Sequence, residues 1–127
     1  MPMDDNDVRE EMEYLDEVML DYSTMVKNIG KNGLAASLLM NYRDEIQDIM
    51  TELAMNNRDV KEYRKKLIML DNELRQKAQA YVNEVGHANF KQYQIINNPP
   101  PERWWWYLNR VTLEREEDKK KPWEFWK

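Results

Sequence analysis

Residues 5–29 have the sequence DNDVREEMEYLDEVMLDYSTMVKNI, in which apolar side chains recur in a fixed rhythm. These side chains are Val8, Met12, Leu15, Met19, Tyr22, Val26 and Ile29. The steps between them alternate between four and three residues, the spacing of a helix that packs along a narrow seam. Gly30 and the pair Asn32-Gly33 follow, and such residues end helices and turn chains. The stretch therefore predicts an amphipathic helix over about residues 5–29.

The same rhythm occurs twice more along the chain. The second set is Ala35, Leu39, Tyr42, Ile46, Ile49 and Leu53, which predicts a helix over about residues 34–56. The third set is Val60, Tyr63, Leu67, Leu70, Leu74, Ala78, Tyr81, Val85 and Ala88, which predicts a helix over about residues 59–88. Within it, the step from Leu74 to Ala78 is four residues where three were due, a local slip in register.

The connections between these helices are short, which makes neighbouring helices antiparallel. We therefore predict an all-α fold, an antiparallel three-helix bundle with coiled-coil-like packing, formed by residues 1–90. The charge distribution agrees, since residues 4–21 hold nine acids and one base, whereas residues 58–77 hold seven bases and four acids. An up-down-up order brings the acidic start of the first helix beside the basic start of the third.

The chain changes character after about residue 90. All five tryptophans follow residue 103, and the sequence Asn97-Asn98-Pro99-Pro100-Pro101 precedes them. We predict a Pro-rich extended linker over residues 91–101 and a Trp-rich C-terminal segment over residues 102–127. A short fourth helix fits residues 102–119, because Trp104, Leu108 and Val111 share one helical face.

Three consecutive tryptophans on a helix point in directions about 100° apart, so one surface cannot bury them all. Indole rings left in water usually mark an interface. Three interpretations stay open: a lid on the bundle, a site for a protein partner or for self-association, and an anchor at a membrane surface. For the second, the candidate residues are Arg103, Trp104, Trp105, Trp106, Tyr107, Arg110, Trp123, Phe125 and Trp126. The third is the weakest, because residues 99–127 hold seven bases and six acids.

Composition narrows the function further. The net charge of −5 argues against a nucleic-acid partner, which requires a concentrated cationic face. There is no cysteine for a disulfide or a thiolate metal site. The N-terminus has no signal-peptide pattern, and no apolar run approaches the roughly 20 residues of a membrane span. We therefore expect a cytoplasmic protein.

Catalytic and metal-binding patterns are sparse. His87 is the only histidine, and with Glu84 it forms one Glu-x-x-His spacing, of which di-iron bundles require two copies. Carboxylate pairs such as Asp44 and Asp48 are most simply interpreted as parts of solvated helix faces.

The methionines along the helices, for example Met50 and Met69, suit either a hydrophobic core or an adaptable binding groove. We expect them to fill the core.

These observations favour a non-enzymatic interaction protein without a cofactor: an adaptor, a chaperone-like factor or an assembly subunit. It would use the Trp-rich segment to bind a protein partner or to form a homo-oligomer. The alternative hypothesis is a ligand- or metal-binding helical bundle, with a dimer supplying the second copy of Glu84 and His87.

Overall fold

The computed structural model describes residues 4–31 and 37–110, and all regular secondary structure in these two ranges is helical. The prediction of an all-α protein is confirmed at this level. Among the described helices, none has the length and apolarity that crossing a bilayer requires. The predicted start of the second helix, residues 34–36, lies outside the described residues, as do residues 111–119 of the predicted fourth helix.

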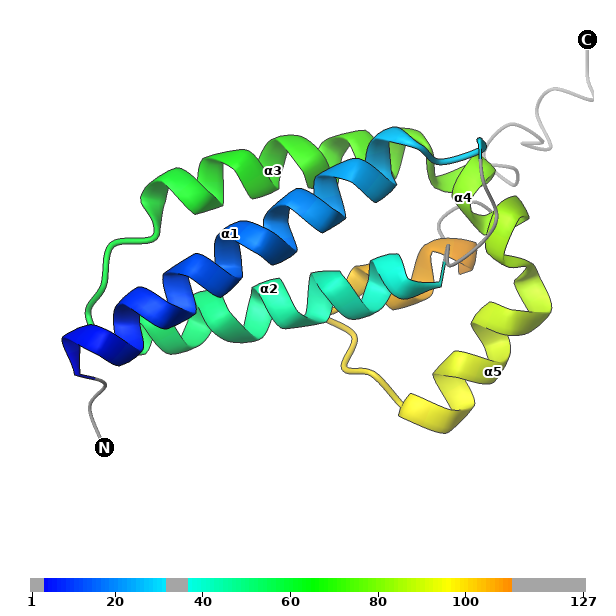
Figure 1. Cartoon of the computed structure of the whole chain (residues 1–127). Helices are drawn as coiled ribbons and strands as arrows, with labels where there is room; N and C mark the ends of the chain where they lie inside the picture. The colour runs from blue at the N-terminus through cyan, green and yellow to red at the C-terminus, as the bar shows by residue number, and fades with distance from the viewer. Residues whose placement is uncertain (1–3, 32–36, 111–127) are drawn as a thin grey trace, which may run out of the picture.

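Three long helices lie side by side and successive ones run in opposite directions (Figure 1): α1 (Asp5–Lys27), α2 (Leu38–Met55) and α3 (Lys61–Gln76). The most extensive packing joins α1 to α2, and α1 also packs against α3. A capping side chain fixes the start of α1, where Asp4 accepts a hydrogen bond from the Asp7 amide at 2.7 Å. Just before α3, Asp59 accepts a hydrogen bond from the Lys61 amide at 2.9 Å.

The apolar seam of each helix forms the core. Fully buried side chains come from all three helices: Leu15, Tyr22 and Val26 of α1, Leu39, Ile46 and Leu53 of α2, and Leu74 of α3. Where α1 begins, Asp5 forms an ion pair with Arg58 at 3.2 Å. The acidic first segment and the basic third segment therefore meet at their starts, as the charge distribution predicts.

The predicted third helix over residues 59–88 is wrong in its extent, because the chain bends twice within it. Helix α3 ends at Gln76, and α4 (Ala78–Val85) follows after Lys77, at the position of the register slip. Helix α4 ends at Gly86, whose φ of +99° is accessible to glycine and strained for other residues. The next helix, α5 (His87–Asn97), then leaves in a new direction (Figure 1).

The predicted linker over residues 91–101 is also wrong in part, since residues 91–97 are helical and belong to α5. Phe90 explains this, because its fully buried ring packs edge-on against Tyr81 at a centroid distance of 5.9 Å. That contact anchors α5 to α4 and holds it in an ordered fold. Only residues 98–103 connect α5 to the tryptophans, and Asn98 adopts a left-handed conformation with φ of +41°.

A buried ion pair joins the three long helices. The guanidinium of Arg43 on α2 donates two hydrogen bonds, each 3.0 Å long, to the carboxylate of Asp71 on α3. The hydroxyl of Tyr22 on α1 donates a third to the same carboxylate at 2.7 Å. Arg43 and Asp71 are 4 % and 7 % exposed, so both charges have left water. Burial, together with the neighbouring Asp71, raises the pKa of Tyr22 above its ordinary value, so the phenol stays neutral.

We predict that Asp71→Ala lowers the free energy of unfolding by about 3–5 kcal/mol, because it leaves the Arg43 charge buried without its partner. Tyr22→Phe, which removes one hydrogen bond to the carboxylate, should cost about 1.5–3 kcal/mol. Urea unfolding followed by circular dichroism measures both. Glu62→Ala is the control, because it breaks an exposed ion pair with Lys65 and should cost about 1 kcal/mol at most. Equal losses for Asp71→Ala and Glu62→Ala would contradict a structural role for the buried pair.

Candidate functional site

The described part of the tryptophan segment, residues 102–110, folds back onto the helices. Trp104–Tyr107 forms a 3-10 turn, η1, and the helical conformation continues to Arg110. Trp105 and Trp106 are 2 % and 4 % exposed, so both indoles belong to the core. Arg103, Trp104 and Tyr107 are half-buried, and Arg110 is exposed. We expected that one surface could not bury all three indoles. Trp105 and Trp106 are nevertheless both buried, and only Trp104 remains partly exposed. Trp123, Phe125 and Trp126 lie outside the described residues.

One carboxylate on α2 receives this segment. Oδ1 of Asp44 accepts hydrogen bonds from the indole N–H groups of Trp105 and Trp106, at 2.8 and 2.9 Å. The same oxygen forms an ion pair with Arg103 at 2.9 Å, and Arg103 also bonds to Asp48. Because a buried indole N–H requires an acceptor, Asp44 explains how two tryptophans fit against one helix.

Two arginines stack on the indoles and connect them to α2 and α3. The guanidinium carbon of Arg43 lies 4.1 Å from the ring centroid of Trp105, and that of Arg75 lies 4.1 Å from Trp104. The two rings meet edge-on at 5.6 Å. Since Arg43 also binds Asp71, the tryptophan segment is continuous with the buried ion pair. It thereby bridges α2 and α3.

Helix α5 holds the segment from its other side. The side-chain amide of Gln94 donates to the backbone oxygen of Trp106 at 3.0 Å and to Asn109 at 2.9 Å. The ring of Tyr93 packs edge-on against Trp106 at 6.2 Å. The hydroxyl of Tyr107 donates to the backbone oxygen of Pro99. These contacts explain the role of the Pro-rich turn, which returns the chain from α5 to α2.

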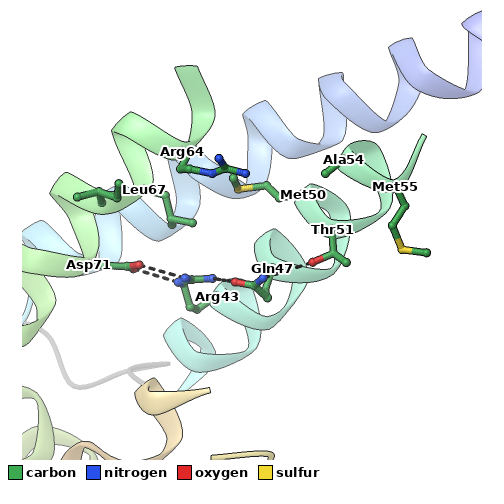
Figure 2. Close-up of a pocket in the computed structure, with 10 residues that line it drawn as sticks. Arg43, Gln47, Met50, Thr51, Ala54, Met55, Arg64, Leu67 and Asp71 are labelled. Atoms are coloured by element: carbon green, nitrogen blue, oxygen red, sulfur yellow. Dashed lines mark hydrogen bonds and ion pairs between the residues drawn. The ribbon is translucent and has the colours of Figure 1, made fainter. Parts of the chain in front are cut away.

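A groove remains open between α2 and α3. It is a pocket of about 570 Å³. Figure 2 shows its lining side chains, with the Arg43–Asp71 pair at one end. Its lining residues are Arg43, Gln47, Met50, Thr51, Ala54, Met55, Arg64, Leu67, Ile68 and Asp71. Along α2, Arg43 donates to Gln47 at 3.2 Å, and Gln47 donates to Thr51 at 3.3 Å, which forms a polar ladder on one wall.

The rest of the groove is apolar and partly exposed. Met55 is 78 % exposed and Ile68 is 54 % exposed, while Met50 and Leu67 lie deeper and are buried. Asp71 is neutralised by Arg43, and Arg64 forms no ion pair with any residue in the described ranges. The groove thus combines an apolar floor with a net positive charge. An apolar stripe flanked by carboxylates has the complementary chemistry.

The sequence-predicted metal candidates do not come together as a site. Gly86 interrupts the helix between Glu84 and His87, so the two side chains lie on different helices. The carboxylate of Glu84 accepts a hydrogen bond from the Gly30 amide, and His87 is exposed at the start of α5. Within residues 4–31 and 37–110, no three histidine, aspartate or glutamate side chains gather as metal ligands.

Comparison with known proteins found no matching family model, no matching curated protein and no matching solved structure.

Sequence reasoning missed the residues that organise this region. Asp44 and Asp48, which we expected to be solvated, bind Arg103, and Asp44 also binds two indoles. The available signal was the spacing of the two carboxylates, four residues apart on one helix face. That spacing is equally common on solvated helices.

We predict that Asp44→Ala lowers the free energy of unfolding by about 2–4 kcal/mol, because two indole N–H groups and Arg103 lose their acceptor. Tryptophan emission of the folded protein should shift to the red, since the indoles become accessible to water. Thermal unfolding and emission spectra measure these effects. Asp48→Ala is the matched control, because Asp48 is more exposed and binds Arg103 alone, so its effect should be about 1 kcal/mol or less. Unchanged stability and emission in Asp44→Ala would show that the segment is held in some other way.

Proposed function

We propose that this protein is a small non-enzymatic interaction protein, an adaptor or assembly subunit built on a three-helix bundle. Its groove between α2 and α3 would bind an amphipathic helix of a protein partner. The observation that carries the proposal is the open apolar groove, in which Met55 and Ile68 remain exposed beside a buried core. An isolated bundle gains nothing from leaving such side chains in water, whereas an added helix would cover them.

In this proposal the tryptophan segment holds the two helices of the groove in place and contributes little direct contact with the partner. Trp105 and Trp106 are buried, and indoles that are already covered cannot anchor a partner without unfolding part of the chain. Trp105 stacks on Arg43 of α2 and bonds to Asp44, whereas Trp104 stacks on Arg75 of α3, so the segment fixes α2 relative to α3 at the Arg43 end of the groove. Trp104, half-buried at that end, remains available at the edge of a contact with a partner. Holding the two walls rigidly lowers the entropic cost of binding.

The residues that line the groove between α2 and α3 favour the binding of partner helices of differing shape. Met50 and Met55 contribute flexible thioether side chains, which fit partners of differing shape better than branched residues do. Thr51 and Gln47 offer polar groups along the α2 wall. The groove thus suits a class of apolar helices better than one specific ligand.

Charge selects among those helices. Arg64 lines the groove, and the exposed Lys61 lies about one turn of α3 before it. A partner helix with carboxylates flanking its apolar stripe would meet these cations. Each ion pair at the edge of such a site adds little affinity, but like charges there would repel a basic helix.

We predict that a synthetic 20-residue helix with leucines on one face and glutamates beside them binds with a dissociation constant of about 1–100 μM. The same peptide with lysines in place of the glutamates should bind at least about tenfold more weakly, because the groove is cationic. Fluorescence anisotropy of the labelled peptides measures both. Added salt should weaken the glutamate peptide, since its advantage is electrostatic.

Two variants locate the binding site. Ile68→Glu places a charge in the groove and should reduce glutamate-peptide binding at least about tenfold, because it adds repulsion and removes apolar contact. Ile95→Glu is the matched control, since Ile95 is 80 % exposed on α5, away from the groove residues. Binding that Ile68→Glu leaves intact, or equal binding of both peptides, would contradict the proposed function.

A further inference from the structure

A second exposed apolar surface lies on the other side of α3, where that helix runs beside α1 (Figure 1). Here the two helices form a hollow of about 560 Å³. Met19 and Leu70 lie at its base, and Leu20 and Met69 are 68 % and 74 % exposed around it. We refer to this hollow and its surroundings as the α1–α3 face. None of its lining residues belongs to the groove between α2 and α3.

Four charged side chains surround the apolar centre of the α1–α3 face, two on each helix. On α1 they are Asp16 and Lys27, and on α3 they are Lys66 and Glu73. The register of the helices fixes their positions. The Tyr63 hydroxyl bonds to Asp16 at one end of the face, and its pKa is raised by burial and by that hydrogen bond. At the other end Lys77 donates to the backbone oxygen of Val26 and pairs with Glu73.

The signs of these charges therefore alternate around the α1–α3 face. Negative Asp16 and positive Lys66 lie at one end, and positive Lys27 and negative Glu73 lie at the other. Asp16, Lys27 and Lys66 are exposed and form no ion pair within the described part of the chain. Such a pattern is complementary to itself, because a two-fold rotation about an axis in the plane of the face exchanges positive and negative corners.

From this complementarity we propose that the α1–α3 face is the contact between two copies of this chain in a two-fold symmetric dimer. The two-fold axis lies across the helices, so that α1 packs antiparallel to α1 of the partner. Asp16 then lies opposite the partner's Lys27, and Lys66 lies opposite the partner's Glu73. The exposed Leu20 and Met69 of both copies cover one another at the centre.

The antiparallel arrangement is preferred over a parallel one for a reason of charge. Residues 4–21 hold nine acids and one base, and they begin beyond the Asp16 end of the face. A parallel dimer would pack α1 against the partner's α3 with the two helix dipoles aligned, which opposes association. The antiparallel dimer opposes the helix dipoles and places each acidic segment toward the partner's end that carries Lys27 and Lys77.

Sedimentation velocity of the full chain over a range of concentrations tests the proposal. The expected result is a monomer–dimer equilibrium in which Met69→Glu raises the dissociation constant at least about tenfold, since it places a charge at the apolar centre. Ile95→Glu is the matched control, and Ile68→Glu, in the groove between α2 and α3, should also leave the dimer unchanged. Circular dichroism verifies that each variant is folded. A chain that stays monomeric at every concentration, or a dimer that Met69→Glu leaves intact, would overturn the proposal.

Charge exchange identifies the pairing. Asp16→Lys alone should weaken the dimer, because it faces the partner's Lys27, and adding Lys27→Asp should restore it. Asp16→Lys with Lys66→Asp is the comparison, since it restores complementarity only in a parallel dimer. Restoration by this second pair and not by the first would overturn the antiparallel arrangement. Because the peptide experiment uses the groove between α2 and α3, failure of the dimer leaves the proposed function standing, and the reverse also holds.

Discussion

A carboxylate removed from water destabilises a fold unless it is paired, and in this protein Asp71 is removed from water where α1, α2 and α3 meet. Its two oxygens accept hydrogen bonds from Arg43 and Tyr22, so each long helix contributes one side chain to a single cluster. Apolar packing along the seams supplies most of the driving force for folding, but it is tolerant of small sliding between helices. The buried cluster does not tolerate such sliding, because a shift of one helical turn would separate Arg43 from Asp71 and leave both charges unpaired.

The tryptophan segment depends on the same cluster. Arg43 binds Asp71 with its donor groups and offers its face to the ring of Trp105, so one side chain serves both α3 and the segment. Asp44, the next residue on α2, then accepts the indole N–H groups. Consecutive residues of α2 thus bind α3 and the C-terminal segment. The groove between α2 and α3 begins at this junction, where Arg43 and Asp71 belong to its lining.

The sequence predicted much of the helical scaffold because periodicity is a local property. The seam residues Leu15, Tyr22, Leu39 and Leu53 are buried as their spacing requires. The breaks at Lys77 and Gly86 were less predictable, since a register slip and a lone glycine occur in continuous helices as well. Helix α5 was missed because its anchor, Phe90, is one buried residue without a repeating pattern. The contacts of Asp44 and the pairing of Arg43 with Asp71 join residues far apart in sequence, and no local pattern distinguishes them from solvated charges.

Hydrogen exchange of the indole and backbone N–H groups, followed by nuclear magnetic resonance, tests most directly whether the tryptophan segment is part of the scaffold. If Arg43, Asp71, Asp44 and the tryptophans form one cooperative unit, the indole N–H groups of Trp105 and Trp106 exchange only through global unfolding. Their free energy of opening then equals that of the core amides around Ile46 and Leu74. Exchange of both indoles at a much lower free energy than these amides would contradict the account, since it would mean that the segment detaches while the three long helices stay folded.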